Sequence, residues 1–227
     1  MKKKKRESTS AILKDRSILK QEVYAVTKAK FQELKSVIEK EIDALKEDIQ
    51  DERVRLIFEE KTDYQVHAYA GSDLLIFNMH SNVFCFPDEH PIQKTSYVED
   101  DFTRAYCGVI HIYNFLADSF LHNRMNDAGY LLGRIFINKE NHFMVEGKGQ
   151  LGMLFRDFLH EELTTEKMHQ IVDEAIRHAA KFDLLTPPAD MIATISVMQM
   201  QTMSSAQQLK TGKRLGFRFN ADNDKIF

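Results

Sequence analysis

The sequence predicts an α+β fold in which a long N-terminal amphipathic helix precedes a mostly antiparallel sheet of about five to seven strands with two helices packed on it. Three observations support this class. Apolar residues recur at helical spacing in the first quarter of the chain, then at a spacing of two between residues 64 and 146. Helical spacing returns after residue 150.

The first quarter of the chain indicates one long helix. Residues 1–70 contain neither Gly nor Pro, and apolar residues recur helically from about Ser10 to Glu60. Between Phe31 and Ile49 their mean spacing is about 3.6, which places them in one straight stripe. A helix of about 45 residues would be roughly 65 Å long, longer than the domain that follows. We therefore expect a homodimer or higher homo-oligomer through residues 19–49. A break near Asp51–Arg53 into two helices is the alternative.

We divide the chain into a helical extension at residues 1–60, comprising a basic tail and the helix, and a single α+β domain at residues 61–227. Segments 64–70 and 74–79 flank Gly71-Ser72-Asp73, a pattern typical of a hairpin. A turn centred there places His67 opposite Ile76.

The remaining elements follow from the same two spacings. Residues 104–116 read as a long strand, 117–129 as a segment with a short helical turn, and 130–137 with 142–146 as a second hairpin. Residues 87–103 are polar, contain two prolines and read as a long loop. Residues 151–159 and a segment capped by Thr164 or Thr165 predict two helices. Segments 191–202 and 214–219 read as final strands.

The strands carry apolar residues on both faces. In segment 104–116, Ile110 and Ile112 lie on one face, whereas Val109 and Phe115 lie on the other. A strand that is apolar on both faces is covered on both sides. We therefore expect helices, a second sheet or a partner subunit on each face of the sheet.

Composition restricts the class of protein. Of the 227 residues, 43% are hydrophobic and 29% are charged, which excludes wholesale disorder. The net charge is −3, yet Lys2–Arg6 is entirely basic, so the rest of the chain is mildly acidic and a broad nucleic-acid surface is not expected. Cys85 and Cys107 lie in apolar runs and predict free thiols in the cytoplasm. No secretory signal or membrane span is expected.

The best motif match is Gly147-Lys148-Gly149-Gln150-Leu151-Gly152, a G-x-G-x-x-G between a strand and a helix. Glycines permit close backbone approach, and a helix N-terminus offers free N–H groups to a phosphate. We therefore take Gly147, Lys148, Gly149 and Gly152 as candidate ligand- or phosphate-binding residues. The alternative is a glycine-rich turn with one exposed lysine, since the strands upstream form hairpins and not a βαβ unit.

Two weaker patterns involve metal ions. Glu146-x-Lys148 with an upstream Asp127 or Asp118 resembles the carboxylate and lysine set of a Mg²⁺-dependent nuclease. Four potential Zn²⁺ ligands surround one strand-to-loop junction, at His80, Cys85, Asp88 and His90. The tripeptide Glu146-x-Lys148 is common by chance and Asp127 lies in a turn, while the second set contains neither C-x-x-C nor H-x-x-x-H. We therefore predict no metal and no cofactor.

These observations favour a non-catalytic cytoplasmic module that self-associates through its N-terminal helix and binds a small ligand. The alternative is an enzyme acting on a phosphorylated or nucleotide ligand at the Gly147–Gly152 turn. A structure that shows whether a pocket exists, and whether this turn opens into it, distinguishes the two.

Overall fold

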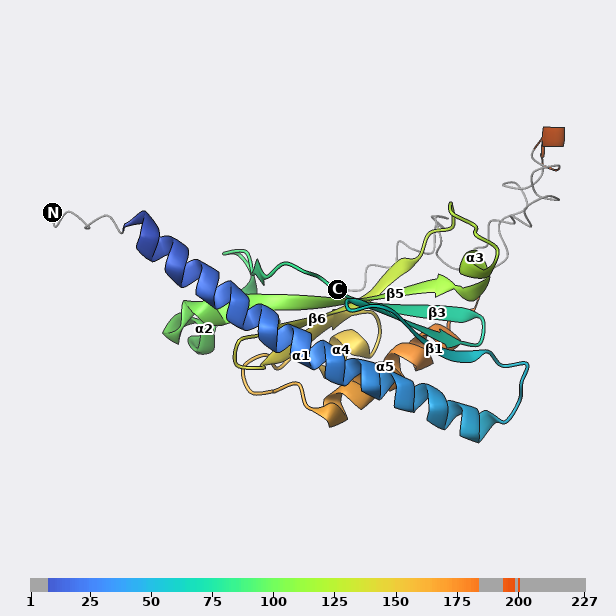
Figure 1. Cartoon of the computed structure of the whole chain (residues 1–227), viewed down its shortest axis with the longest axis horizontal. Helices are drawn as coiled ribbons and strands as arrows, with labels where there is room; N and C mark the ends of the chain where they lie inside the picture. Colours follow the sequence, from blue (N-terminus) through green and yellow to red (C-terminus); the bar gives the residue numbers. More distant parts are fainter. Residues whose placement is uncertain (1–7, 184–193, 199, 201–227) are drawn as a thin grey trace.

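A computed structural model describes residues 8–183, 194–198 and 200 (Figure 1). The helices are α1 (Thr9–Ile49), η1 (Pro91–Lys94), α2 (Ser96–Asp100), η2 (Phe102–Ala105), α3 (Ala117–Leu121), α4 (Leu151–Leu154) and α5 (Thr165–Ala180). The strands are β1 (Leu56–Thr62), β2 (Gln65–Ala70), β3 (Asp73–Met79), β4 (Phe84–Cys85), β5 (Tyr106–Leu116), β6 (Tyr130–Asn138) and β7 (Phe143–Gly147). The α+β class predicted from the sequence is confirmed.

Helix α1 is one unbroken helix of 41 residues. The Ser8 side chain accepts a hydrogen bond from the backbone N–H of Ala11, and Gln50 adopts a left-handed conformation with φ of 49° that ends the helix. The predicted helical pattern to Glu60 was therefore too long, and no second helix follows the break. Segment 56–62 forms β1 instead, because its apolar residues pack against the sheet equally well at a spacing of two.

The strands form one seven-stranded sheet in the order β1-β2-β3-β5-β6-β7, with β4 paired to β5, and all of these pairings are antiparallel. Both predicted hairpins are confirmed, as β2–β3 and β6–β7. His67 lies opposite Ile76, as the turn at Gly71 predicted. This register fixes which side chains share a face of the sheet.

Helices α1 and α5 cover one face. Their apolar side chains form a single core with Val66, Phe77 and Ile110 of the sheet. The stripe of α1 is buried there, with Phe31, Leu34, Ile38, and Ile42 each 0% exposed. Most of the apolar stripe from which a partner chain was predicted is thus covered within the chain, although Ile49 is 42% exposed. The sequence predicts residues 1–60 as an extension beside the domain at 61–227. In the structure, the inner face of α1 belongs to the same core as the sheet.

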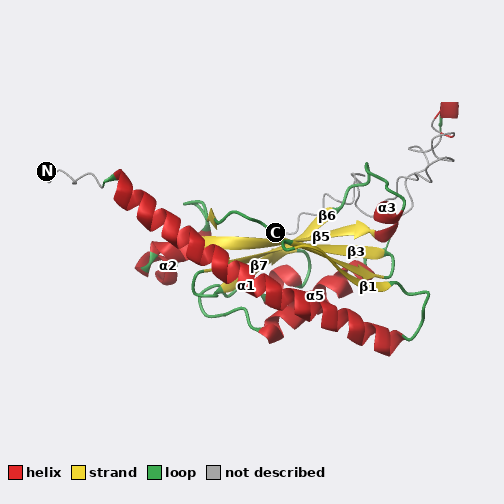
Figure 2. Cartoon of the chain, viewed as in Figure 1, coloured by secondary structure: helices red, strands yellow, loops and turns green. Residues whose placement is uncertain are grey.

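The described residues cover the second face of the sheet only at its ends. At one end, the segment 86–105, which contains η1, α2 and η2, packs on Val109 and Phe136. At the other end, α3 lies over β3 and β5 through Ala117. Figure 2 shows α2 and α3 at opposite ends of the sheet. The middle of this face is left for the site described below.

Some predicted elements differ from the structure. The predicted loop at 87–103 contains short helical turns, and the predicted helix at 151–159 is helical only in α4. Helix α5 is capped by Thr164, whose side chain accepts from the N–H of Lys167. Half of the strand predicted at 191–202 lies outside the described residues. In the described half the strand prediction is wrong, because Val197, Met198 and Met200 are helical and the N–H of Met200 donates to the Ser196 carbonyl at 3.0 Å. The strand predicted at 214–219 lies entirely outside the described residues. Within the described part of the chain, no helix is long and apolar enough to cross a membrane.

Candidate ligand groove on the open face of the sheet

The Gly147–Gly152 turn joins an antiparallel strand to a helix of only four residues. The backbone N–H of Lys148 donates to the Leu132 carbonyl at 2.9 Å and so belongs to the sheet. A Cβ on Gly152 would lie 2.3 Å from the Gly147 carbonyl oxygen. The close packing of these two glycines therefore accounts for them without a phosphate. Phosphate binding at Gly147, Lys148, Gly149 and Gly152 stays a prediction.

The two metal patterns are dispersed in the fold. Glu146 forms an ion pair with Arg134 on β6, whereas Asp127 pairs with Arg124 beyond α3 at 2.9 Å. Among the residues that the structure describes, no three His, Cys, Asp or Glu side chains gather in a group that could hold a metal ion.

Polar side chains instead form a row across the open face. The register places Gln65 opposite Asn78, Asn78 opposite His111, His111 opposite Arg134, and Arg134 opposite Glu146. The row runs perpendicular to the strands from β2 to β7, because residues paired across an antiparallel sheet point to the same face. The rest of this face is apolar. The polar row therefore lies in the part of the face that neither the segment 86–105 nor α3 covers.

The row borders a hollow of about 410 Å³ between β5, β6 and the segment that follows β4. Its apolar walls include Phe84, Phe86, Val109 and Phe136, and its polar groups come from His90, His111, Arg134 and Glu146. A volume of several hundred Å³ with apolar walls and a few convergent polar groups is typical of small-molecule sites. We refer to this hollow as the groove.

Arg134 and Glu146 provide the charges of the groove. They form a short ion pair, and the Arg134 guanidinium lies 5.1 Å from the centre of the Phe136 ring. Glu146 Oε1 is 3.7 Å from His90 Nε2, which is too long for a hydrogen bond. The pair therefore presents N–H donors beside a carboxylate acceptor, over an aromatic surface.

The two histidines of the groove are positioned by aromatic contacts. His90 stacks on Phe86, and its Nδ1 accepts from the N–H of Ile92 at 3.3 Å, so in the neutral ring the proton is on Nε2. His111 stacks on Tyr113. Burial, followed by the nearby charges of His80 and Arg134, lowers the pKa of His111. We therefore expect His111 to be neutral at pH 7.

The thiols of the groove are not activated. Burial is the main cause that raises the pKa of both Cys85 and Cys107. A raised pKa keeps a thiol protonated at neutral pH and makes it a poor nucleophile. Neither cysteine therefore has the environment of a catalytic thiolate.

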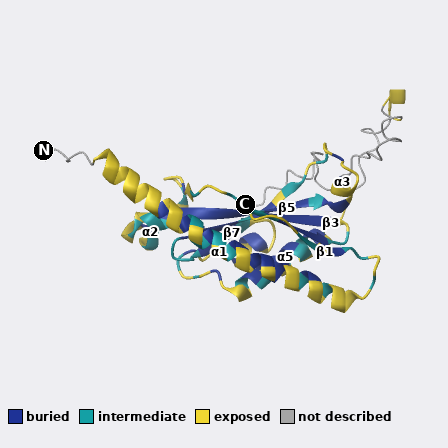
Figure 3. Ribbon diagram, viewed as in Figure 1, coloured by how far each residue is buried: buried dark blue, intermediate teal, exposed yellow. Residues whose placement is uncertain are grey.

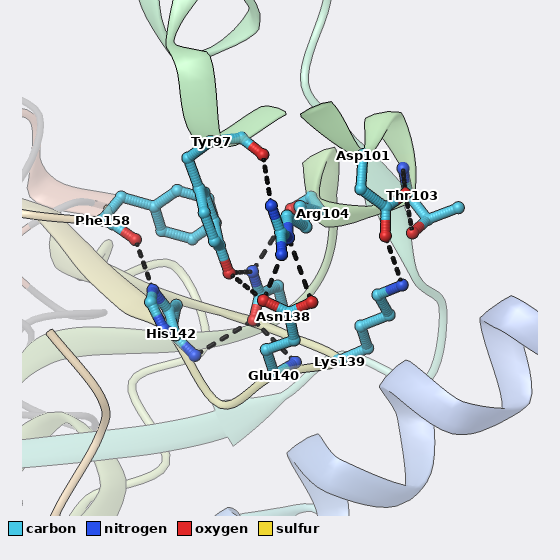
Figure 4. A network of polar contacts seen from close by, with 9 residues as sticks. All are labelled: Tyr97, Asp101, Thr103, Arg104, Asn138, Lys139, Glu140, His142 and Phe158. Carbon is cyan, nitrogen blue, oxygen red and sulfur yellow. Dashed lines mark hydrogen bonds and ion pairs between the residues drawn. The ribbon is translucent and has the colours of Figure 1, made fainter. Parts of the chain in front are cut away.

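A buried polar network holds the segment 86–105 against the β6–β7 hairpin (Figure 4). Asn138, which is 0% exposed, donates from Nδ2 to the Tyr97 hydroxyl at 2.9 Å, and Tyr97 donates to Glu140 at 2.8 Å. Arg104 donates to Glu140 at 3.0 Å and to the Tyr97 carbonyl at 3.0 Å.

A second contact lies beside this network. Lys139 pairs with Asp101 at 2.7 Å, and the hydrogen bond from Lys139 is the main cause that holds the pKa of Asp101 well below its usual range. Together, these contacts fix the wall of the groove that the segment 86–105 supplies.

Sequence reasoning identified Gly147 and Lys148, which border a smaller hollow of about 230 Å³ that also contacts Arg134 and Glu146. It missed His111, Arg134 and Phe136. His111 lies on β5, whereas Arg134 and Phe136 lie on β6. Only the register between these two strands brings the three residues together. Comparisons with protein-family models, with curated proteins and with solved structures found no match for this chain.

Proposed function

We propose that this protein is a non-catalytic binding module that holds a small, flat, partly apolar molecule in the groove. The observation that carries the proposal is the Arg134–Glu146 pair, which lies over Phe136 in a hollow of about 410 Å³. The pair offers donor and acceptor groups side by side, and the aromatic walls offer a stacking surface. The protonated thiols support binding rather than covalent catalysis, and two free cysteines support a cytoplasmic location.

The ligand chemistry follows from these groups. A heteroaromatic ring that carries a donor next to an acceptor satisfies Glu146 and Arg134 at once, while its faces contact Phe136 and Phe86. Adenine has this arrangement at its exocyclic amine beside N1 and N7 and also at N9–H beside N3, whereas purine lacks the amine and keeps only the N9–H edge. The two compounds therefore form a matched pair of probes for the groove.

Titration of the full chain with adenine and purine, monitored by ligand-detected NMR, tests the proposal. We expect saturable binding of adenine, weaker binding of purine, and at least a tenfold loss of adenine affinity in Arg134→Gln. Arg177→Gln is the control, because it removes an exposed arginine that pairs with Asp173 on α5. Binding of neither compound, or equal affinity in Arg134→Gln and wild type, contradicts the proposal.

A second candidate function concerns a phosphorylated ligand. The smaller hollow beside Lys148 shares Arg134 and Glu146 with the groove, so a nucleotide whose base occupies the groove could extend its phosphate toward Lys148. AMP and adenosine differ only in that phosphate. Tighter binding of AMP that is lost in Lys148→Ala, together with turnover of AMP detected by ³¹P NMR, would favour the enzyme. Equal affinity for the two compounds would count against it.

Self-association is the remaining part of the proposal. The apolar stripe of α1 is buried within the chain, so residues 19–49 offer mainly their charged outer faces to a partner. Three of the four large apolar side chains that α1 exposes lie near its start, at Ile12, Leu13 and Ile18, and the fourth, Ile49, lies at its end.

A further inference from the structure

A second hollow, of about 320 Å³, lies on the same face of the sheet at the α3 end. Its floor is formed by His67, Ile76 and Tyr113, which lie side by side in register across β2, β3 and β5. Phe120 of α3 forms part of its wall. Tyr113 stacks on His111 with ring centres 5.7 Å apart, and this ring pair separates the hollow from the groove.

His67 is the unusual residue in this hollow. It is 5% exposed, its Nδ1 is buried, and neither of its ring nitrogens forms a hydrogen bond with the described part of the chain. Its ring makes edge-to-face contacts with two aromatic rings. The distance between ring centres is 5.5 Å to Phe120 and 6.4 Å to Tyr69. Buried polar groups in proteins nearly always have a partner, and an exception calls for an explanation such as a ligand.

The surroundings of His67 determine its protonation. Burial, and then the charge of Lys61, lowers the pKa of His67, so we expect a neutral ring at pH 7. A proton on Nδ1 would bury an N–H group that has no acceptor, which is the rarer and more costly defect. The proton therefore belongs on Nε2, and His67 offers this N–H as a donor to an occupant of the hollow.

The other polar groups of the hollow are amides. Gln65 and Asn78 lie opposite each other at its rim, and none of its lining residues carries a charge at neutral pH. Ile76, Phe115 and Phe120 supply apolar and aromatic surface. The two charges that act on His67, those of Glu59 and Lys61, already pair with each other at 2.6 Å. A charged molecule would therefore be desolvated here without a free counter-charge, whereas an uncharged ring with a carbonyl group would meet both kinds of surface.

We propose that this hollow is a second binding site, which takes a small uncharged molecule with one flat apolar ring and a carbonyl acceptor that binds the Nε2–H of His67. Benzamide is the simplest probe of this class. Benzoate and benzylamine have the same ring with a negative or a positive charge. The site is separate from the groove, so it stands or fails independently of the proposed function.

Titration of the full chain, labelled with ¹⁵N-histidine, with each of the three compounds tests this site. We expect benzamide to shift the His67 Nε2 resonance in a saturable way and to bind at least tenfold more tightly than benzoate or benzylamine. His67→Phe keeps a ring and removes both nitrogens, so we expect at least a tenfold loss of benzamide affinity. His160→Phe is the control, because the His160 side chain is 77% exposed and lies outside the hollow.

Phe120→Ala provides a second variant in case His67→Phe does not fold, because Phe120 is 40% exposed and its loss opens the wall of the hollow. We expect it to weaken benzamide binding as well. The proposal is overturned if benzamide does not bind saturably, if its affinity is unchanged in the folded His67→Phe and Phe120→Ala variants, or if benzoate binds as tightly as benzamide.

Discussion

Asn138 is the residue on which the wall of the groove depends. Its Oδ1 accepts from the N–H groups of Glu140 and His142, at 2.9 and 3.0 Å, and its Nδ2 donates to Tyr97. A buried amide that makes all these bonds orders the β6–β7 turn and the segment 86–105 together. Such networks are stabilising only while every member is satisfied.

Removal of the Tyr97 hydroxyl should therefore destabilise the protein. Tyr97→Phe leaves the Asn138 Nδ2 with only the Arg104 carbonyl at 3.5 Å, so we expect a loss of about 1–3 kcal/mol in the free energy of unfolding. Urea denaturation measures this loss. Tyr113→Phe is the matched control and should change stability little, because no hydrogen bond to its hydroxyl is formed by the described residues. Equal stabilities for the two variants would contradict the role of the network.

The histidines of the open face predict a dependence of stability on pH. The pKa values of His67 and His111 are lowered in the folded state, each mainly by burial, relative to an unfolded value of about 6.5. As pH falls below about 6.5, the unfolded chain binds protons that the folded chain does not yet bind. This stabilising contribution is complete above pH 6.5 and is lost as pH falls toward the lowered folded values.

Urea midpoints at pH 7.5 and 5.5 test this expectation. We expect a lower midpoint at pH 5.5, and a smaller difference between the two pH values in His67→Gln/His111→Gln. The carboxylates with lowered pKa values, Asp51, Asp101 and Glu140, titrate at more acidic pH and do not interfere. His160→Gln is the control, since His160 is exposed. An unchanged pH difference in the double variant would show that other groups are responsible.

Contacts between individual residues were the least predictable from the sequence. The opposition of His67 and Ile76 could be predicted, because a two-residue turn fixes the register of its own hairpin. The row from Asn78 to Glu146 could not, because the connections from β3 to β5 and from β5 to β6 are long and leave their registers open. The groove is a product of those registers.

At the scale of elements, Gly108 determines how closely α1 approaches the sheet. A Cβ at this position would lie 2.0 Å from Oγ1 of Thr27, which is fully buried and donates to the Val23 carbonyl at 2.7 Å. The helix therefore crosses β5 at a point where only glycine leaves room for it. Neither residue suggests this contact in the sequence, because they lie in separate elements.

A double-mutant cycle tests this contact. We expect Gly108→Ala to lower the free energy of unfolding by about 1–3 kcal/mol or more, because α1 must shift away from β5. Thr27→Gly removes the three side-chain atoms that the new methyl group meets, at a cost of about 1 kcal/mol for a glycine within a helix. The double variant should be more stable than the sum of the single effects predicts. Strict additivity would mean that the two residues do not meet.

Elements were more predictable than their boundaries. The hairpins and α5 follow from periodicity, turn residues and a capping threonine, all of which act locally. The end of α1 could not be predicted in this way. The spacing of Leu56 and Phe58 suits either a helix or a strand, and pairing with β2 decides between them. The segment after Leu154 is irregular although its apolar spacing is helical. Its backbone instead bonds to β7, where the N–H of Val145 donates to the Phe155 carbonyl at 2.8 Å.

For the whole molecule, the long N-terminal helix is both part of the core and an extension beyond it. From Leu19 to Ile42 its inner face is buried against the sheet and α5. Its first turns project past the sheet and are exposed (Figures 1 and 3). The surplus length inferred from the sequence is therefore real, and it lies mainly in the first ten helical residues, about 15 Å, with a shorter exposed stretch between Leu45 and Ile49 at the other end.

This projecting end provides the test of self-association. Ile12, Leu13 and Ile18 are 45%, 62% and 47% exposed, and a second copy of the helix end would bury them. We expect light scattering of the full chain to show a dimer, and Ile12→Glu/Leu13→Glu/Ile18→Glu to shift it to monomer without lowering the melting temperature, because these side chains lie outside the core. Ile49→Glu alters an exposed residue at the opposite end of α1 and is the control. A monomeric wild-type chain at about 100 μM, a concentration at which micromolar affinities are saturated, would contradict self-association through α1.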